Sequence, residues 1–144
     1  MAGSAAPEPV HRGRCYCGAS RVEAFRAPQI VAYCHCHDCR RWTGGPVAVF
    51  AAFAVEDLRL LPWPEPRRWG GVTRWNCPAC GSPLAAAFDY LPGQIYVPIG
   101  ILEDAPSLAP SLHCHAENAL PWLCLSDDLP RQEGSARAAL GPQG

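Results

Sequence analysis

Apolar positions along this chain fall in short runs that alternate with polar residues and are interrupted by glycine and proline. A period of two is typical of β-strands with one buried face, and frequent turn residues separate such strands from one another. No segment shows the long 3.6-residue period that marks an amphipathic helix. The pattern therefore predicts an all-β domain of several sheets, built from many short strands with only short helical turns.

Most of the predicted elements lie between residues 20 and 99. The apolar and aromatic segment 46–55 is the best candidate for a core strand. The other expected strands are residues 20–25, 29–34, 58–61, 72–75, 84–88 and 94–99. One helical turn is expected at residues 38–43.

The length of 144 residues predicts one domain. We expect residues 11–131 to form it, and the Ala-, Pro- and Gly-rich ends, 1–10 and 132–144, to be disordered tails. A formal net charge of −1 argues against a nucleic-acid partner. No stretch is long and apolar enough to cross a bilayer, so no membrane contact is expected.

Residues 1–10 lack the basic start and the hydrophobic stretch of a signal peptide, which predicts a cytoplasmic protein. In that reducing compartment, clustered cysteines indicate metal ligands rather than disulfides. Seven of the nine cysteines are clustered in this way. They are Cys15 and Cys17; Cys34, Cys36 and Cys39; and Cys77 and Cys80.

Thiolates two or three residues apart can bind the same small cation. Four thiolates complete a tetrahedral zinc site, whereas three leave one position open. The sequence therefore predicts two zinc ions per chain, one structural and one able to take up a ligand. Two cysteines alone cannot fill the four coordination positions of zinc. The simplest structural site therefore combines the two two-cysteine clusters.

Spacing alone leaves two alternatives open. The closed site could instead consist of Cys34, Cys36, Cys39 and Cys77. The same spacings also suit a rubredoxin-like iron, although thiolate sites of this kind favour zinc.

The three-cysteine cluster favours thiol chemistry. Three thiolates on a dication leave a net charge of −1, which weakens the metal as a Lewis acid toward water. A thiol suits the fourth position better, because coordination deprotonates it outright. The resulting thiolate is a soft nucleophile that adds to an aldehyde and gives a hemithioacetal. His37, in the turn beside the open position, is a candidate for moving a proton, whereas His35 is expected on the opposite face, hydrogen-bonded at the sheet edge.

Cations near the cluster are candidates for binding a substrate carboxylate. Arg40 and Arg41 directly follow Cys39, and Arg74 is the next candidate. Trp42 could flank the same pocket.

Other polar and thiol groups are assigned structural roles. Asp127 and Asp128 are expected to cap a turn. Cys114 and Cys124 have no partner at ligand spacing, so inert thiols are expected. His113 and His115 alternate on an expected strand, which predicts that they share one face. Surface or structural roles are expected for them, the alternative being that one approaches the open metal position.

The chain from about Gly13 to Arg131 resembles the glutathione-dependent formaldehyde-activating enzyme family, which also contains the vertebrate centromere protein V. The matching segments are 13–18 (GRCYCG), 33–40 (YCHCHDCR), 77–82 (CPACGS), 97–100 (VPIG), 102–104 (LED), 121–122 (PW) and 127–130 (DDLP). The resemblance implies a twisted, tent-like all-β fold stapled by zinc. It also assigns the ligands: Cys15, Cys17, Cys77 and Cys80 to the structural zinc, and Cys34, Cys36 and Cys39 to the second.

The function implied is that of a zinc-dependent carbon–sulfur lyase acting on a thiol–aldehyde adduct. The family reaction joins glutathione and formaldehyde to give S-(hydroxymethyl)glutathione, or runs in reverse. Two alternatives remain: a non-catalytic, zinc-stabilised interaction module, and a thiol or zinc sensor. The sequence does not predict an oligomeric state.

Overall fold

The computed structural model describes residues 6–136 of the chain. The outer parts of both expected tails, residues 1–5 and 137–144, lie outside the described residues. The strands are β1 (His11–Arg14), β2 (Arg21–Ala24), β3 (Ile30–Cys34), β4 (Ala48–Ala54), β5 (Leu58–Leu61), β6 (Arg67–Trp69), β7 (Val72–Asn76), β8 (Pro83–Phe88), β9 (Gln94–Pro98) and β10 (Leu112–Cys114). They are accompanied by the helix α1 (His37–Thr43) and the 3₁₀ turns η1 (Val55–Asp57), η2 (Ile99–Ile101), η3 (Ala105–Ser107) and η4 (Ala116–Asn118).

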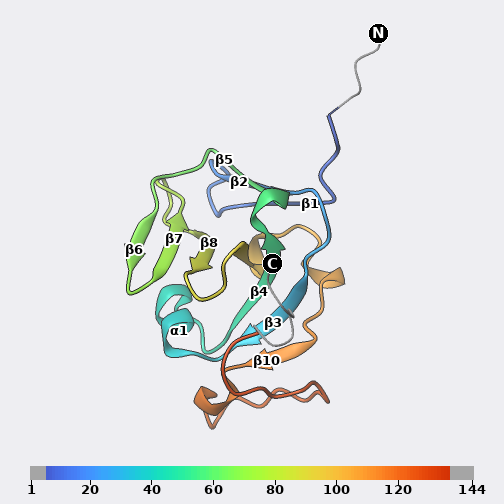
Figure 1. Ribbon diagram of the computed structural model, residues 1–144, viewed down its shortest axis with the longest axis vertical. Helices are drawn as coiled ribbons and strands as arrows, with labels where there is room; N and C mark the ends of the chain where they lie inside the picture. The colour runs from blue at the N-terminus through green and yellow to red at the C-terminus, as the bar shows by residue number, and fades with distance from the viewer. Residues whose placement is uncertain (1–5, 137–144) are drawn as a thin grey trace.

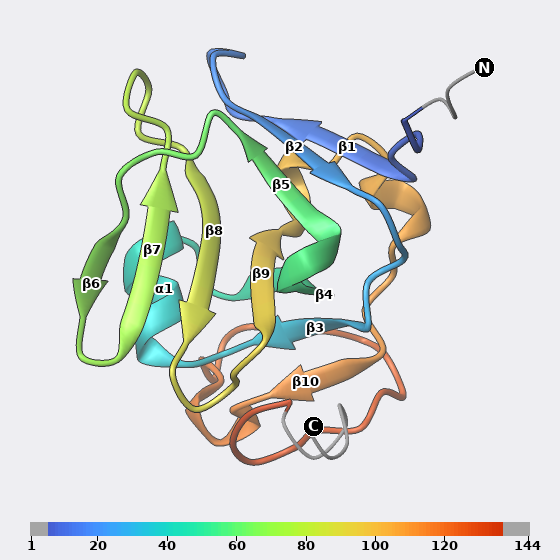
Figure 2. The same cartoon turned by 45° about the horizontal axis from the view of Figure 1, so that its top comes forward.

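Two sheets make up the fold (Figures 1 and 2). The smaller has the order β1-β2-β5, and the larger has the order β10-β3-β4-β9-β8-β7-β6. Neighbouring strands are antiparallel except for β10 and β3, which run parallel. The predicted all-β fold with short helical turns is thus confirmed. No helix within residues 6–136 is long and apolar enough to span a membrane.

Strand β4 is buried on both faces, because it lies in the middle of the larger sheet with a separate layer on each side. Ala51 and Phe53 belong to the core shared with Leu60 of the smaller sheet. Phe50 and Ala52 point the other way, into a second core beneath α1. The alternation of side chains along one strand therefore divides the interior in two. The second core contains the three-cysteine cluster.

The C-terminal segment packs along β10, the outermost strand of the larger sheet. The backbone N–H of His113 donates to the carbonyl of Pro130, and the backbone N–H of Gln132 donates to the carbonyl of His113 at 2.8 Å. Ala136 is buried against the same strand. The packed chain therefore continues to Ala136, past the expected domain boundary at residue 131.

Candidate metal centres and an adjoining cavity

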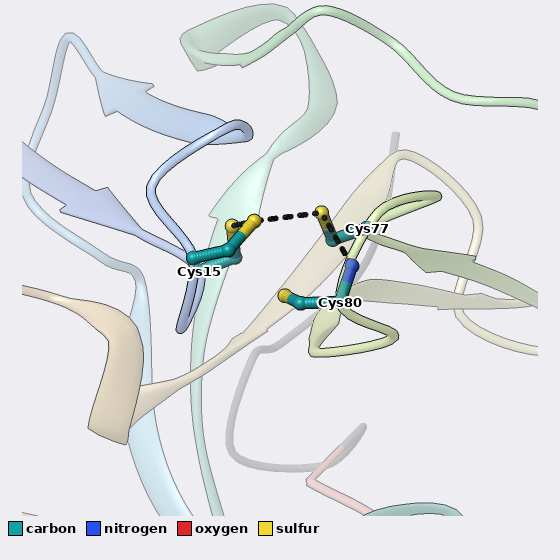
Figure 3. Close-up of side chains that lie close together, drawn as sticks. Cys15, Cys77 and Cys80 are labelled. Atoms are coloured by element: carbon teal, nitrogen blue, oxygen red, sulfur yellow. Dashed lines mark hydrogen bonds between the residues drawn. The ribbon is translucent and has the colours of Figure 1, made fainter.

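The four-cysteine cluster joins the two sheets. Cys15 and Cys17 follow β1, and Cys77 and Cys80 lie in the turn between β7 and β8 (Figure 3). The sulfurs of Cys15 and Cys17 are 3.6 Å apart, and those of Cys17 and Cys77 are 3.8 Å apart. Sulfurs about 3.8 Å apart are expected around a tetrahedral ion with bonds of about 2.3 Å. This group can therefore hold a metal ion.

Polar groups of the chain itself surround these sulfurs. The backbone N–H of Ser20 donates to Cys15 Sγ at 3.3 Å, and that of Cys80 donates to Cys77 Sγ at 3.5 Å. Ser82 Oγ lies 3.1 Å from Cys80 Sγ, and this contact is the main reason that the pKa of Cys80 is lowered to about 5. Such donors favour the thiolate form that binds metal.

Glycines allow both knuckles to turn tightly. Gly18 and Gly81 have φ angles of 83° and 79°, in the left-handed region. The N–H of Gly81 donates to the carbonyl of Cys77 at 2.8 Å, and that of Gly18 donates to the carbonyl of Cys15 at 3.2 Å. A side chain at either position would strain this backbone, which explains the glycine after each cysteine pair.

The three-cysteine cluster comes from one continuous segment. Cys34 ends β3, Cys36 is the N-cap of α1, and Cys39 lies in the first turn of that helix. The sulfur of Cys34 is 3.4 Å from those of both Cys36 and Cys39. Among residues 6–136, no fourth cysteine, histidine or acidic residue joins this group, and Cys77 belongs to the other one. The three sulfurs can hold a metal ion and leave a coordination position to an outside ligand.

Hydrogen-bond donors converge on the sulfur of Cys36. Hydrogen bonds from the thiols of Cys34 and Cys39 lower the pKa of Cys36. The contact with Cys36 raises the pKa of Cys34, and burial adds to this. The N–H of Cys39 also donates to Cys36 Sγ at 3.3 Å. These donors favour the thiolate form of Cys36, which is the form that binds metal.

A cavity of about 40 Å³ adjoins the three-cysteine cluster. Its walls are mainly apolar and include the rings of Phe50, Phe88, Tyr90 and Tyr96. One water needs about 10–15 Å³ of such space, so the cavity admits a group of a few heavy atoms. It can therefore receive a small reacting group beside the sulfurs.

Two residues at the end of β10 also line this cavity, although the sequence favoured structural roles for both. Cys114, expected to be an inert thiol, is 5% exposed, and burial raises its pKa to about 11. His115 adopts a left-handed backbone with φ of 53° just after the strand. This turn brings His115 to the cavity while His113 faces elsewhere, so the expectation that the two histidines share a face was wrong.

The residues predicted to move protons and bind substrate are dispersed. His37 is the exposed first residue of α1 and does not line the cavity. Arg40 donates from Nη1 to the carbonyl of Asn118 at 2.7 Å. Arg41 and Trp42 instead line a separate open groove.

This groove has a volume of about 490 Å³ and contains two guanidinium groups. The guanidinium of Arg74 lies 4.3 Å from the ring centre of Trp42 and 5.6 Å from that of Phe88. Its Nη1 is buried and has no hydrogen-bond partner among residues 6–136. Since Phe88 lines the cavity, Arg74 connects the groove to the cavity wall.

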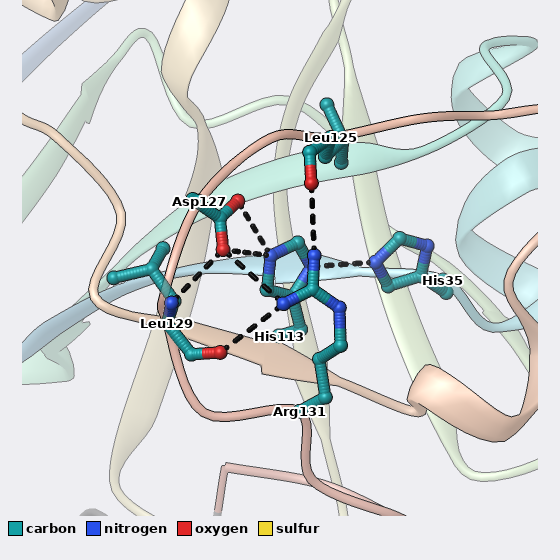
Figure 4. Close-up of polar contacts among 6 residues, drawn as sticks. All are labelled: His35, His113, Leu125, Asp127, Leu129 and Arg131. Carbon is teal, nitrogen blue, oxygen red and sulfur yellow. Dashed lines mark hydrogen bonds and ion pairs between the residues drawn. The ribbon is translucent and has the colours of Figure 1, made fainter.

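A hydrogen-bond network joins His35, His113 and Asp127 (Figure 4). His35 Nε2 is 2.9 Å from His113 Nδ1, and His113 Nε2 is 3.0 Å from a carboxylate oxygen of Asp127. Burial lowers the pKa of His35. Asp127 also accepts the N–H of Leu129 at 3.0 Å, which confirms its predicted role as a turn cap. The network holds β10 and the C-terminal segment beside β3.

Comparison with known proteins places the chain in a protein family. The model of a family described as "Glutathione-dependent formaldehyde-activating enzyme" matches residues 10–118, which include all seven clustered cysteines. No curated protein matches the chain significantly. A crystal structure of a Rhodobacter sphaeroides protein is 22% identical, with a TM-score of 0.52, and covers 84% of this chain and 99% of that chain. At that identity the likeness concerns the fold alone.

Proposed function

Because the chain belongs to the glutathione-dependent formaldehyde-activating enzyme family, we propose that it is a zinc-dependent carbon–sulfur lyase acting on the adduct of a small thiol and an aldehyde. Glutathione and formaldehyde are the proposed pair, with S-(hydroxymethyl)glutathione as the adduct. The observation that carries this proposal is the group of three sulfurs, without a fourth ligand from residues 6–136, beside a small cavity.

Zinc fits both cysteine groups. Sets of four thiolates at tetrahedral separations favour zinc, and the spacings of 3.6 and 3.8 Å agree with it. We assign a structural ion to Cys15, Cys17, Cys77 and Cys80. A second ion belongs to Cys34, Cys36 and Cys39, where the fourth position remains for the substrate thiol. When bound there, this metal deprotonates the thiol that reaches it.

The residues around the cavity serve the reaction by enclosing it. Carbon–sulfur bond formation needs a thiolate close to the carbonyl carbon, and the π electron pair moves to oxygen as the bond forms. The oxygen then takes up one proton, which balances the proton lost by the thiol. The aromatic walls keep water from competing at the same carbon.

The remainder of the thiol substrate needs cations, because glutathione carries two carboxylates. We assign this role to Arg41 and Arg74 in the groove, with Trp42 as its wall. The buried, unpartnered Nη1 of Arg74 supports this assignment. Arg40 is a weaker candidate than expected, because one of its N–H groups already donates to a backbone carbonyl.

The proposed cellular location, partner and proton carrier are consistent with this reaction. All nine cysteines lie within the described residues and are free, which agrees with a reducing, cytoplasmic location. A small molecule remains the proposed partner. His37 is not retained as the leading proton carrier, because His115 lies at the cavity and His37 does not.

The test uses the zinc-loaded protein and ¹³C-labelled formaldehyde with glutathione. Exchange spectroscopy measures how fast carbon passes between the free aldehyde and its adduct, a reaction that also proceeds unaided. We expect the exchange rate to rise in proportion to protein concentration, and to return to the unaided rate with Cys36→Ser. The exposed Cys124→Ser is the matched control and should retain full activity. A fully metallated protein that leaves the rate unchanged would support the interaction-module alternative.

A further inference from the structure

The hydroxyl of Tyr96 is a buried polar group without a partner. The residue is 7% exposed, and its Oη has no hydrogen bond to any group among residues 6–136. Buried hydroxyls are nearly always hydrogen-bonded, because losing water without gaining a partner destabilises the folded state. An exception beside a cavity therefore points to a ligand that supplies the missing partner.

The sheet fixes the position of this side chain firmly. Tyr96 lies in β9, directly opposite Ala52 of β4. Its ring meets that of Phe50 edge-on at 6.4 Å, and that of Phe88 at 5.3 Å. With two aromatic neighbours and a strand on either side, the tyrosine has little freedom to turn toward another partner.

The same side chain lines the cavity beside the three sulfurs. Cys34 and Cys114 line the same cavity, and so does Tyr90, which is 47% exposed. A phenol has an ordinary pKa of about 10, so it keeps its proton at neutral pH and can donate a hydrogen bond.

We propose that the cavity is a binding site for the oxygen of the thiol–aldehyde adduct, with the Tyr96 hydroxyl as its hydrogen-bond donor. This inference rests on the proposed function for the identity of the reaction, but the binding site itself does not depend on turnover. The cavity volume of about 40 Å³ limits the aldehyde to a few heavy atoms. The chemical class is thus a short hydroxyalkyl thioether or its parent aldehyde.

The hydrogen bond strengthens as charge develops on the oxygen. In the forward direction the thiolate sulfur bonds to the carbonyl carbon, the C=O π pair moves to oxygen, and negative charge accumulates there. A donor held in place by the sheet stabilises that charge without reorganising. The oxygen finally carries one proton, equal to the one lost by the thiol, so the reaction exchanges no net proton with solvent. In reverse, the same contact holds the hydroxyl as the carbon–sulfur bond breaks.

The first test measures binding of two thiols that differ by one hydroxyl group. Calorimetry on the zinc-loaded protein compares 2-mercaptoethanol with ethanethiol, in the wild type and in Tyr96→Phe. We expect the wild type to prefer 2-mercaptoethanol by about fivefold, the value of one hydrogen bond to a neutral group, and Tyr96→Phe to lose most of that preference. Tyr16→Phe, whose side chain is 93% exposed, is the matched control and should keep it. An unchanged preference in Tyr96→Phe, or no binding of either thiol, overturns the inference.

The second test measures thermal unfolding without thiol present. Removing an unpartnered buried hydroxyl should leave the Tm of Tyr96→Phe equal to that of the wild type or higher. A clear loss of Tm would show that the hydroxyl has a structural partner, and would also overturn the inference.

Activity separates the two proposals. If the wild type accelerates adduct exchange, Tyr96→Phe should lower the rate about tenfold or more with unchanged zinc content. If the wild type does not accelerate it, the proposed function fails. In that case, the calorimetric comparison of 2-mercaptoethanol with ethanethiol still decides whether Tyr96 binds the hydroxyl group of a thiol ligand.

Discussion

The two cysteine clusters use the same ligand atom but are built in opposite ways. The four-cysteine cluster brings together segments 60 residues apart, between two sheets. The protein itself provides all four sulfurs of this cluster. The three-cysteine cluster lies within six consecutive residues of the chain, and an apolar cavity adjoins it. Thiolate ligands alone do not distinguish a structural from a reactive metal site. The two kinds of site differ in whether the protein or an outside molecule provides the fourth ligand.

The surroundings reinforce this difference. Around the four-cysteine cluster, backbone N–H groups and the Ser82 hydroxyl provide donors to sulfur, as Ser20 and Cys80 illustrate. Around the three-cysteine cluster, the cavity wall contains aromatic rings, and the Tyr96 hydroxyl among them has no hydrogen-bond partner in the described part of the chain. The first site is complete as folded, whereas the second has polar capacity left for a ligand.

The largest expected effect separates the clusters by stability. Cys77→Ser should unfold the domain, because a structural zinc site contributes on the order of 10 kcal/mol, comparable to the whole stability of a domain. Cys36→Ser should keep the fold and one zinc ion, because its cluster closes only a short local loop. Circular dichroism with metal analysis checks both variants. Equal collapse of the two proteins would remove the distinction.

A smaller effect is expected where the groove would bind the substrate tail. Arg74→Gln should raise KM for glutathione by about tenfold or more, with a much smaller change in kcat, because a charge-assisted hydrogen bond to a carboxylate is lost. Steady-state kinetics with glutathione check this. Arg59→Gln, an exposed arginine of β5 stacked on Phe25, is the control and should leave KM unchanged. A parallel loss of kcat in Arg74→Gln would assign the arginine to the sulfur cluster rather than to the groove.

The smallest effect concerns the network behind the three-cysteine cluster. The hydrogen bond from His113 is the main reason that the pKa of Asp127 lies below its usual value. A lowered carboxyl pKa stabilises the folded state above the unfolded-state pKa, and this contribution is lost as pH falls through the lower, folded-state value. Asp127→Asn should therefore be less stable than the wild type at pH 7, with the gap closing below about pH 4. Urea midpoints for both proteins at each pH check this, and a gap independent of pH would mean that the carboxylate charge does not contribute.

Much of the fold followed from local patterns. Strands such as β4, β5 and β9 were predicted to within two residues, because alternation and turn residues record burial directly. By contrast, β1 and β6 were not predicted. Every residue of β6 is exposed, so no apolar pattern marks it, and only pairing with β7 makes it a strand.

The candidate site was predictable only in part. Cysteine spacing indicated which residues could hold metal, but their division into four and three depends on which segments meet in space. Tyr96 joins the cavity through the register of β9 with β4, and His115 joins it through a left-handed turn at a residue that rarely adopts one. Neither arrangement leaves a local signal. Cavities formed by distant strands therefore need the tertiary structure.

The most direct test of the distinction between the clusters is zinc-edge X-ray absorption of the fully loaded protein, with and without glutathione. We expect an average of about 3.5 sulfur ligands per zinc without thiol, rising to 4 when thiol completes the open site. An average of 4 before any thiol is added, or no change on its addition, would contradict this expectation.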